Sequence, residues 1–195
     1  MTFASRLAPA VAVSLLLSTG TVARAASIAL DPLPRLPIQE KEATRSLSRQ
    51  EVLAMLREST PVSAEFKLED DRYFLVTREW VEKMFLWVKA FLARQLDPER
   101  LDGFLVSRPR EVALMIESLA ELDVQRAHAV RGQALVGMLS LECHLTATQE
   151  PLDGHICFYV IFGTAAGLHV LEPATGKIQA LRDFPQRNDV IRVFF

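Results

Sequence analysis

Two residues near the end of the chain, His155 and Glu172, could together perform acid–base chemistry. His155 opens the apolar segment 156–162, and Glu172 closes the segment 168–171, so we expect the imidazole and the carboxylate on neighbouring strands. A histidine that acts as the base and a carboxylate that orients its ring are two of the three members of a nucleophilic triad. Strand alternation predicts one shared face for His155 and Cys157. The missing component is the nucleophile.

Cys143 and Ser107 are the candidate nucleophiles. Cys143 falls in an expected strand, away from the positive end of a helix that would lower the pKa of a thiol. Ser107 precedes Pro109 and Glu111, a pattern typical of a helix start, so its hydroxyl fits a helix cap as well as a nucleophile. Both readings of Ser107 stay open at this point.

The chain contains two cysteines, and a disulfide between them competes with a reactive thiol. If segments 134–145 and 155–162 pair antiparallel around Glu150, Cys143 and Cys157 lie opposite one another, at a separation that a disulfide can bridge. An even number of cysteines in an oxidising compartment favours pairing. We therefore predict a Cys143–Cys157 disulfide, with Cys143 as nucleophile the alternative.

Composition argues against several kinds of partner and cofactor. The four histidines lack the spacing to cysteines or carboxylates that is typical of zinc sites, and no glycine-rich phosphate loop occurs. We expect no metal and no cofactor. The net charge of −2 comes from interspersed signs without a basic stripe, which argues against a nucleic-acid partner.

The beginning of the chain predicts export. Residues 1–25 combine Arg6, an apolar stretch at 7–17 and Ala23-Arg24-Ala25, the small-residue pattern of a signal-peptide cleavage site. The apolar stretch is shorter than the roughly 20 residues that span a bilayer. We expect a periplasmic or secreted protein that does not span the membrane after cleavage.

Three regions follow from this pattern: the signal peptide, an arm at 26–45 and one domain at 46–195. Pro32, Pro34 and Pro37 favour an extended conformation for the arm. In the domain, apolar periodicity predicts helices at 49–58, 78–96 and 108–130. Ser48 and Glu51 are expected to form a capping box for the first helix, Thr77 to cap the second, and Asp97-Pro98 to end it. Segment 65–76 is expected to be an exposed loop that leads into a short extended piece at 73–76, and segment 101–103 to be a turn. Branched and aromatic residues then predict strands, listed as 134–145, 156–162, 168–171 and 190–195. Helices first and strands afterwards indicate an α+β domain whose antiparallel sheet packs on the long helix.

The C-terminal residues resemble the second half of a papain-like cysteine hydrolase, the superfamily of the NlpC/P60 and CHAP cell-wall amidases and endopeptidases. Gly154-His155, a hairpin and Glu172-Pro173-Ala174-Thr175-Gly176 are similar to a branch found in phages and bacteria. The resemblance covers 133–195 and, loosely, 73–101. It implies a papain-like fold with His155 as base and Glu172 as orienting acid. The family's cysteine would begin the central helix, but segment 107–113 contains none.

The resemblance implies two functional hypotheses, and the proline-rich arm adds a third. The first is a catalytically degenerate papain-like domain that binds an envelope protein, a peptide or a peptidoglycan fragment, in a cleft between the start of helix 108–130 and the His155 strand. The second is an active amide hydrolase that uses His155 and Glu172 with Cys143 or Ser107. The third is a scaffold protein whose proline-rich arm docks onto a partner.

Overall fold

The computed structural model describes residues 32–33, 46–127, 132–144 and 151–195, and of residues 121–127, 143–144 and 151–155 it describes the backbone alone. The expected signal peptide at 1–25 lies outside the described residues, as does the arm at 26–45 apart from Pro32 and Leu33. Leu33 packs against the apolar cluster that the helices form.

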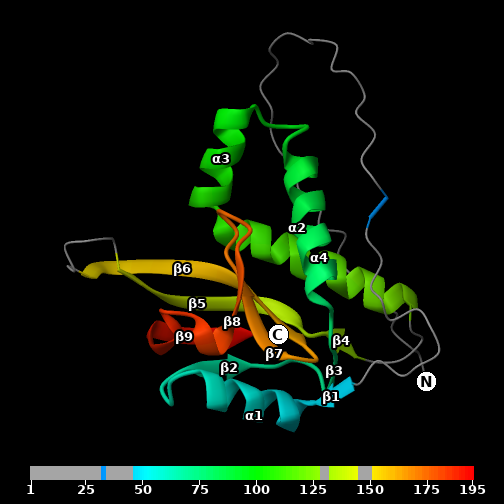
Figure 1. The fold of residues 1–195 in the computed structure, drawn as a ribbon, viewed down its shortest axis with the longest axis vertical. Coiled ribbons are helices and arrows are strands. Elements are labelled where there is room, and N and C mark those ends of the chain that lie inside the picture. Colours follow the sequence, from blue (N-terminus) through cyan, green and yellow to red (C-terminus); the bar gives the residue numbers. More distant parts are fainter. Residues whose placement is uncertain (1–31, 34–45, 128–131, 145–150) are drawn as a thin grey trace, which may run out of the picture.

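A six-stranded mixed sheet forms the middle of the molecule (Figure 1), with the strand order β2-β9-β5-β6-β7-β8. Its strands are β2 (Glu65–Lys67), β5 (Val136–His144), β6 (Pro151–Thr164), β7 (Gly167–Leu171), β8 (Ile178–Ala180) and β9 (Val190–Phe194). The pairs from β9 to β8 are antiparallel, whereas β2 runs parallel to β9. The α+β class is therefore confirmed, but the expectation of a purely antiparallel sheet is wrong.

A second, small sheet has the order β1-β3-β4 and joins the N-terminal part of the domain to the C-terminal strands. It consists of β1 (Ser46–Ser48), β3 (Arg72–Phe74) and β4 (Gln133–Ala134). Antiparallel β1 and parallel β4 flank β3. The short extended piece expected at 73–76 overlaps β3, whereas β2 lies in the part of segment 65–76 that is expected to be a loop. Long-range partners complete backbone hydrogen bonds of β2 that local sequence does not indicate.

The described residues of the domain also form four α-helices: α1 (Arg49–Ser59), α2 (Arg78–Leu92), α3 (Pro98–Ser107) and α4 (Pro109–Ala127). The capping box expected at Ser48 and Glu51 is present, and the Thr77 side chain caps α2 as expected. The turn predicted at 101–103 is wrong, since these residues lie inside α3. Asp97 caps that helix, and Pro98 occupies its first turn, where the missing N–H costs nothing.

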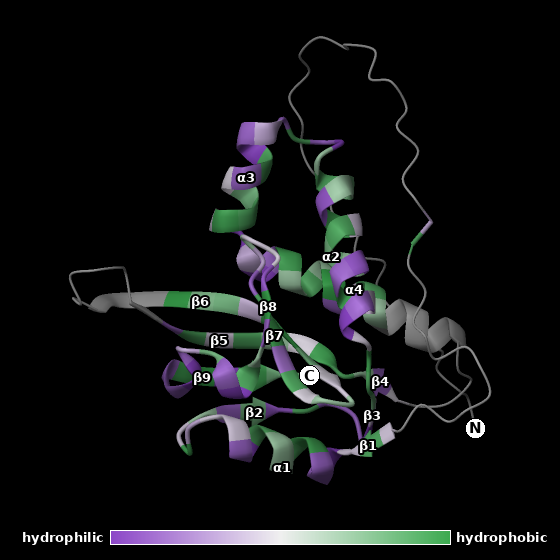
Figure 2. Ribbon diagram, viewed as in Figure 1, coloured by the Kyte–Doolittle hydropathy of each residue, from purple (hydrophilic) through white to green (hydrophobic). Residues whose placement is uncertain are grey.

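Helices cover both faces of the large sheet (Figure 1). Side chains on one face, including Val160 and Phe162, pack with α2 and α4, while those on the other face, including Leu139 and Ile161, pack with α1. The separation follows from the alternation of side chains along a strand. In Figure 2, β5 and β6 are largely green, whereas α1 carries both colours, as a helix with one buried face should.

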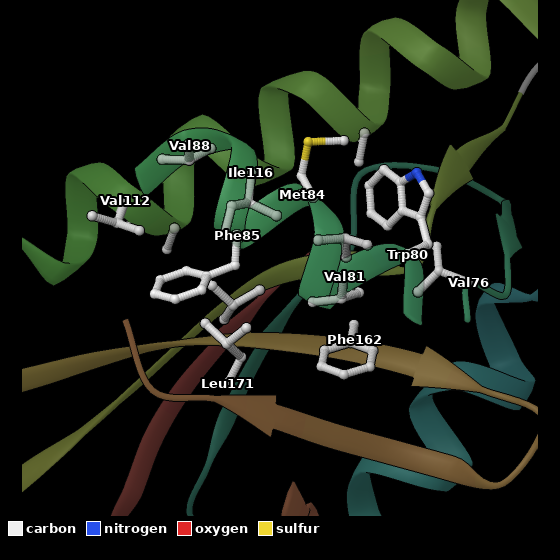
Figure 3. Packing of buried hydrophobic residues seen from close by; sticks show 14 of the residues in the cluster. Val76, Trp80, Val81, Met84, Phe85, Val88, Val112, Ile116, Phe162 and Leu171 are labelled. Atoms are coloured by element: carbon white, nitrogen blue, oxygen red, sulfur yellow. The ribbon is translucent and has the colours of Figure 1, made fainter. Parts of the chain in front are cut away.

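The core on the α4 face is formed by α2, α4 and the sheet, with α4 packing directly on β5 and β6 and α2 packing beside it. Figure 3 shows Val81 and Phe85 of α2 between Val112 and Ile116 of α4 and the strand residue Phe162. Four of these side chains are fully buried, and Phe85 is 6% exposed. This packing fixes the position of α4 on the sheet, and with it the position of the start of α4.

Candidate functional site

The Glu172-Pro-Ala-Thr-Gly segment forms a closed loop between β7 and β8. The backbone N–H of Glu172 donates to the carbonyl of Lys177 at 2.9 Å, and the N–H of Gly176 donates to the carbonyl of Glu172 at 2.7 Å. The Thr175 hydroxyl donates to the Glu172 carboxylate at 2.7 Å. Gly176 has a φ of +75°, and a Cβ at this position would overlap the ring of Phe85. The three hydrogen bonds stabilise the turn, and the glycine at position 176 allows its backbone conformation.

The strand register places Glu172 beside Tyr159. The last pair of β6 and β7 is Val160 opposite Leu171, so the next residues along the two strands are Tyr159 and Glu172. Burial raises the pKa of the Tyr159 hydroxyl above its ordinary value, and the nearby Glu172 carboxylate raises it further. The Tyr159 hydroxyl also donates to the side-chain oxygen of Gln186 at 3.3 Å. A tyrosine is thus the described neighbour of this carboxylate.

His155 lies four residues further along β6, which is about 13 Å in a regular strand. Its side chain is outside the described part of the structure. Between the pairs Glu142–Ile156 and His144–Pro151, β6 has three more residues than β5. This irregularity interrupts the alternation of side chains, so the expected shared face of His155 and Cys157 does not follow from the register.

Ser107 is the last residue of α3 and does not cap α4. Its exposed hydroxyl donates to the carbonyl of Gly103 at 2.6 Å, one turn earlier in the same helix. The expectation that Ser107 begins the long helix is therefore wrong, because Arg108 separates the two helices and α4 begins at Pro109. The hydroxyl bonds within its own helix.

Cys157 is disulfide-bonded in the structure, and no described cysteine is free. The other cysteine of the sequence is Cys143, whose backbone belongs to β5 and whose side chain lies outside the described residues. The residue directly opposite Cys157 is Leu141, so the expected register is wrong by two positions. The pairing of Cys157 with Cys143 stays a prediction.

The start of α4 carries a cation over an aromatic ring. The guanidinium of Arg110 lies 5.9 Å from the centroid of the Phe158 ring, in cation–π range. Phe158 packs with the cluster on the α4 face, while its neighbour Cys157 packs with the cluster on the opposite face. The start of α4 therefore presents Arg110 to the Phe158 ring of β6.

A pocket of about 300 Å³ lies along α4, and Arg110 forms part of its wall. Arg110, Leu114 and Glu117 recur every three to four residues on one side of this helix. Met138 of β5 and Phe194 of β9, which lie opposite one another on the paired strands, contribute apolar surface. We call this feature the α4 pocket.

The β2–β3 connection contributes Glu69 and Asp70 to the lining of the α4 pocket, and Gln133 and Phe195 complete it. The N–H of Asp70 donates to the hydroxyl of the buried Tyr73 at 3.0 Å. Burial raises the pKa of Tyr73, the Asp70 N–H lowers it, and the Asp70 carboxylate raises it. The carboxylate of Asp70 is thus held near a buried phenol at one side of the pocket.

Arg110 and Asp70 were not singled out from the sequence as site residues. The spacing of Arg110, Leu114 and Glu117 on one helix could have indicated their common side. The acidic wall could not be found in this way, because the parallel pairing of Glu65 with Arg192 is what brings the β2–β3 connection to β9.

The described residues contain no group of three histidine, cysteine, aspartate or glutamate side chains placed to hold a metal ion. Within the same part of the chain, no helix combines the length and the apolar character needed to cross a membrane.

No family model and no curated protein matches this chain. Among solved structures, the chain is similar to one titled "PSL1a-E64 complex", with 13% sequence identity and a TM-score of 0.52. The likeness shows a shared fold. It covers 77% of this chain and 51% of the other, so the chain spans about half the length of that structural neighbour.

Proposed function

We propose that this chain is an exported, catalytically degenerate papain-like domain that acts as a binding module in the cell envelope and takes a peptide partner in the α4 pocket. The observation that carries the proposal is the position of Arg110 over Phe158 at the start of α4. A papain-like hydrolase needs a thiol at this position, where the positive end of the helix favours the thiolate. An arginine offers a cation and hydrogen-bond donors, which serve binding.

The candidate nucleophiles are poorly placed for the alternative, an active amide hydrolase that uses His155 and Glu172. Ser107 donates its proton within α3, and no described base lies within hydrogen-bonding distance of it. The Glu172 carboxylate accepts from Thr175 in its own loop. We propose that Cys143 is the disulfide partner of Cys157, which would leave neither cysteine as a nucleophile.

The α4 pocket has the general character of a ligand site. Its volume of about 300 Å³ is at the lower end of the range for such sites, and it combines apolar surface with a few charged groups. Leu114 is 41% exposed, so a large apolar side chain is available for contact with a partner. A peptide, or the peptide of a peptidoglycan fragment, offers the apolar and charged groups that this lining complements.

The proposal is tested by immobilising the full chain, with its disulfide intact, and passing over it a pool of short peptides from envelope proteins and peptidoglycan. We expect a subset of peptides to be retained and recovered intact, as measured by mass spectrometry. Leu114→Trp fills the pocket and should reduce retention. Leu86→Trp, at an exposed leucine on α2 that does not line this pocket, is the matched control and should not.

Three results would contradict the proposal: no retention by the wild-type chain, retention that Leu114→Trp leaves unchanged, and shortened peptides in the eluate. Shortening that disappears in a His155→Ala variant would favour the hydrolase instead. A docking arm, the third hypothesis, would instead be favoured by capture that persists in Leu114→Trp and is lost when residues 26–45 are removed.

A further inference from the structure

We infer that the open side of β6 at Ile156–Tyr159 is a second binding surface, which takes a short extended peptide as an added strand and holds an acidic side chain of that peptide at Arg110. We call this surface the β6 edge. None of its four strand residues lines the α4 pocket, so the inference goes beyond the proposed function. It follows from the pairing of β6, from the position where β7 ends and from the charge of Arg110.

The β6 edge is open because β6 extends further than its neighbour β7. Strand β7 pairs with β6 only as far as Val160, whereas β5 accompanies β6 to its first residue, Pro151. Figure 1 shows β5 and β6 continuing together beyond the other strands. Within the described residues, no backbone group apart from those of β5 bonds to the backbone of residues 156–159. Since alternate residues of a strand direct their N–H and C=O groups to opposite sides, two of these four present both groups away from β5.

The sequence of the β6 edge lacks the features that usually prevent the addition of a strand. Ile-Cys-Phe-Tyr contains no charged residue and no proline, and Ile156 is 52% exposed. The protective features lie further along β6, where Pro151 has no N–H to offer and the irregular pairing with β5 interrupts the strand. Strand addition is therefore confined to residues 156–159.

The end of β7 decides which kind of strand fits. Leu171 lies opposite Val160 and occupies the next position on this side of β6. Glu172 then turns toward β8 and donates its N–H to the carbonyl of Lys177 at 2.9 Å. The β6 strand of a second copy of the chain continues past both ends of this edge and would overlap Leu171. A short peptide can end before Leu171, so it is the occupant that the edge accepts.

Arg110 adds a charge to the β6 edge. Its guanidinium lies 5.9 Å from the centroid of the Phe158 ring, and no carboxylate of the described residues lies within 4 Å of it. The neighbouring Glu111 instead pairs with Arg108 at 3.3 Å. Phe158 packs on the α4 face of the sheet, and side chains opposite one another on paired strands share a face. A peptide residue opposite Phe158 thus points toward Arg110, and a carboxylate on that residue matches the planar guanidinium with two parallel hydrogen bonds.

The first test examines the backbone pairing. The probe is the pentapeptide Thr-Val-Glu-Val-Thr, acetylated at its amino end and amidated at its carboxyl end, and isothermal titration calorimetry measures its binding to the full chain. One derivative is N-methylated at both valines and the other at the glutamate. Because alternate N–H groups of an added strand face β6, one derivative should bind about tenfold or more weakly than the parent and the other should bind like it. The modifications act on the ligand and do not depend on the folding of a variant.

The second test examines the charge. Replacing the glutamate of the peptide by glutamine should weaken binding about fivefold or more, because it removes a charge-assisted hydrogen bond. In Arg110→Gln the two peptides should bind alike. Arg94→Gln, which removes an exposed arginine between α2 and α3, is the matched control and should retain the preference for glutamate.

The inference is overturned if the wild-type chain does not bind the pentapeptide, if both N-methylated forms keep binding or both lose it, or if the glutamate and glutamine peptides bind alike. Leu114→Trp fills the α4 pocket and should leave binding of the pentapeptide unchanged. Binding that this variant abolishes would place the peptide in the α4 pocket, which would overturn the β6 edge and leave the proposed function standing.

Discussion

The guanidinium of Arg110 lies over the ring of Phe158, 5.9 Å from its centroid, where the first turn of α4 meets β6. The same arginine lines the α4 pocket. One side chain therefore joins the helix to the sheet and presents a charge to the pocket. Both roles can be measured separately, because the first affects stability and the second affects binding.

We predict a coupling of about 0.5–1 kcal/mol between Arg110 and Phe158, the range for cation–π pairs at exposed sites. Urea unfolding of Arg110→Gln, Phe158→Leu and the double variant gives this value as the departure from additivity. The pair Arg110→Gln and Phe91→Leu is the control, since Phe91 stacks on Trp87 of α2. Additive effects in the Arg110–Phe158 cycle would show that the contact contributes nothing to stability.

Gly176→Ala should lower the free energy of unfolding by roughly 1–3 kcal/mol, because an alanine is strained at positive φ and its Cβ would overlap Phe85. Gly103→Ala is the control, since a Cβ at Gly103 meets nothing within 4 Å and lies inside α3. Alanine there should raise stability by about 0.5–1 kcal/mol. Thermal unfolding of both variants checks the contrast, and a Gly176→Ala protein as stable as wild type would be incompatible with the described turn.

Stability should fall as the pH rises above about 10, the ordinary pKa of tyrosine. Burial raises the pKa of Tyr73 in the folded chain, so the folded state holds the phenolic proton more tightly than the unfolded state. The stabilisation is complete below the unfolded pKa and is lost as the pH rises through the folded one. Urea unfolding between pH 9 and 11 measures the slope. Tyr73→Phe should reduce the slope to the part that Tyr159 contributes, and an unchanged slope would argue against a buried phenol at position 73.

Denatured protein should contain no thiol that reacts with a thiol-directed reagent until a reductant is added, because Cys157 is disulfide-bonded. If Cys143 is the partner, the closed loop holds about 15 residues, and reduction should cost about 3 kcal/mol of stability. Thiol titration and urea unfolding, each with and without reductant, check both statements. A free thiol in the unreduced, denatured chain would exclude the proposed Cys143–Cys157 pair.

Capping side chains predicted the starts of two helices correctly. Ser48 and Thr77 mark helix starts because their side chains accept from backbone N–H groups that have no other partner. Asp97 and Pro98 indicate the end of one helix, and in the structure the same two residues also begin α3. Gly103 was read as part of a turn, but an exposed glycine is tolerated inside a helix at a modest cost.

Relationships between distant segments were harder to predict. The strand pairing that placed Cys143 opposite Cys157 assumed a regular hairpin, and the extra residues on β6 change that register. The pocket was missed for a similar reason. Its walls are separated by some forty residues of sequence, and they meet because β2 pairs with β9 at the other end of the chain.

The central claim is that the start of α4 serves binding and not catalysis. It is tested most directly by incubating the unreduced chain with short peptides and measuring, in one sample by mass spectrometry, which peptides are retained and whether they are shortened. We predict retained peptides of unchanged mass, with retention lost in Leu114→Trp and kept in Leu86→Trp. Shortened peptides in the wild-type sample, absent when His155→Ala is used, would contradict the account.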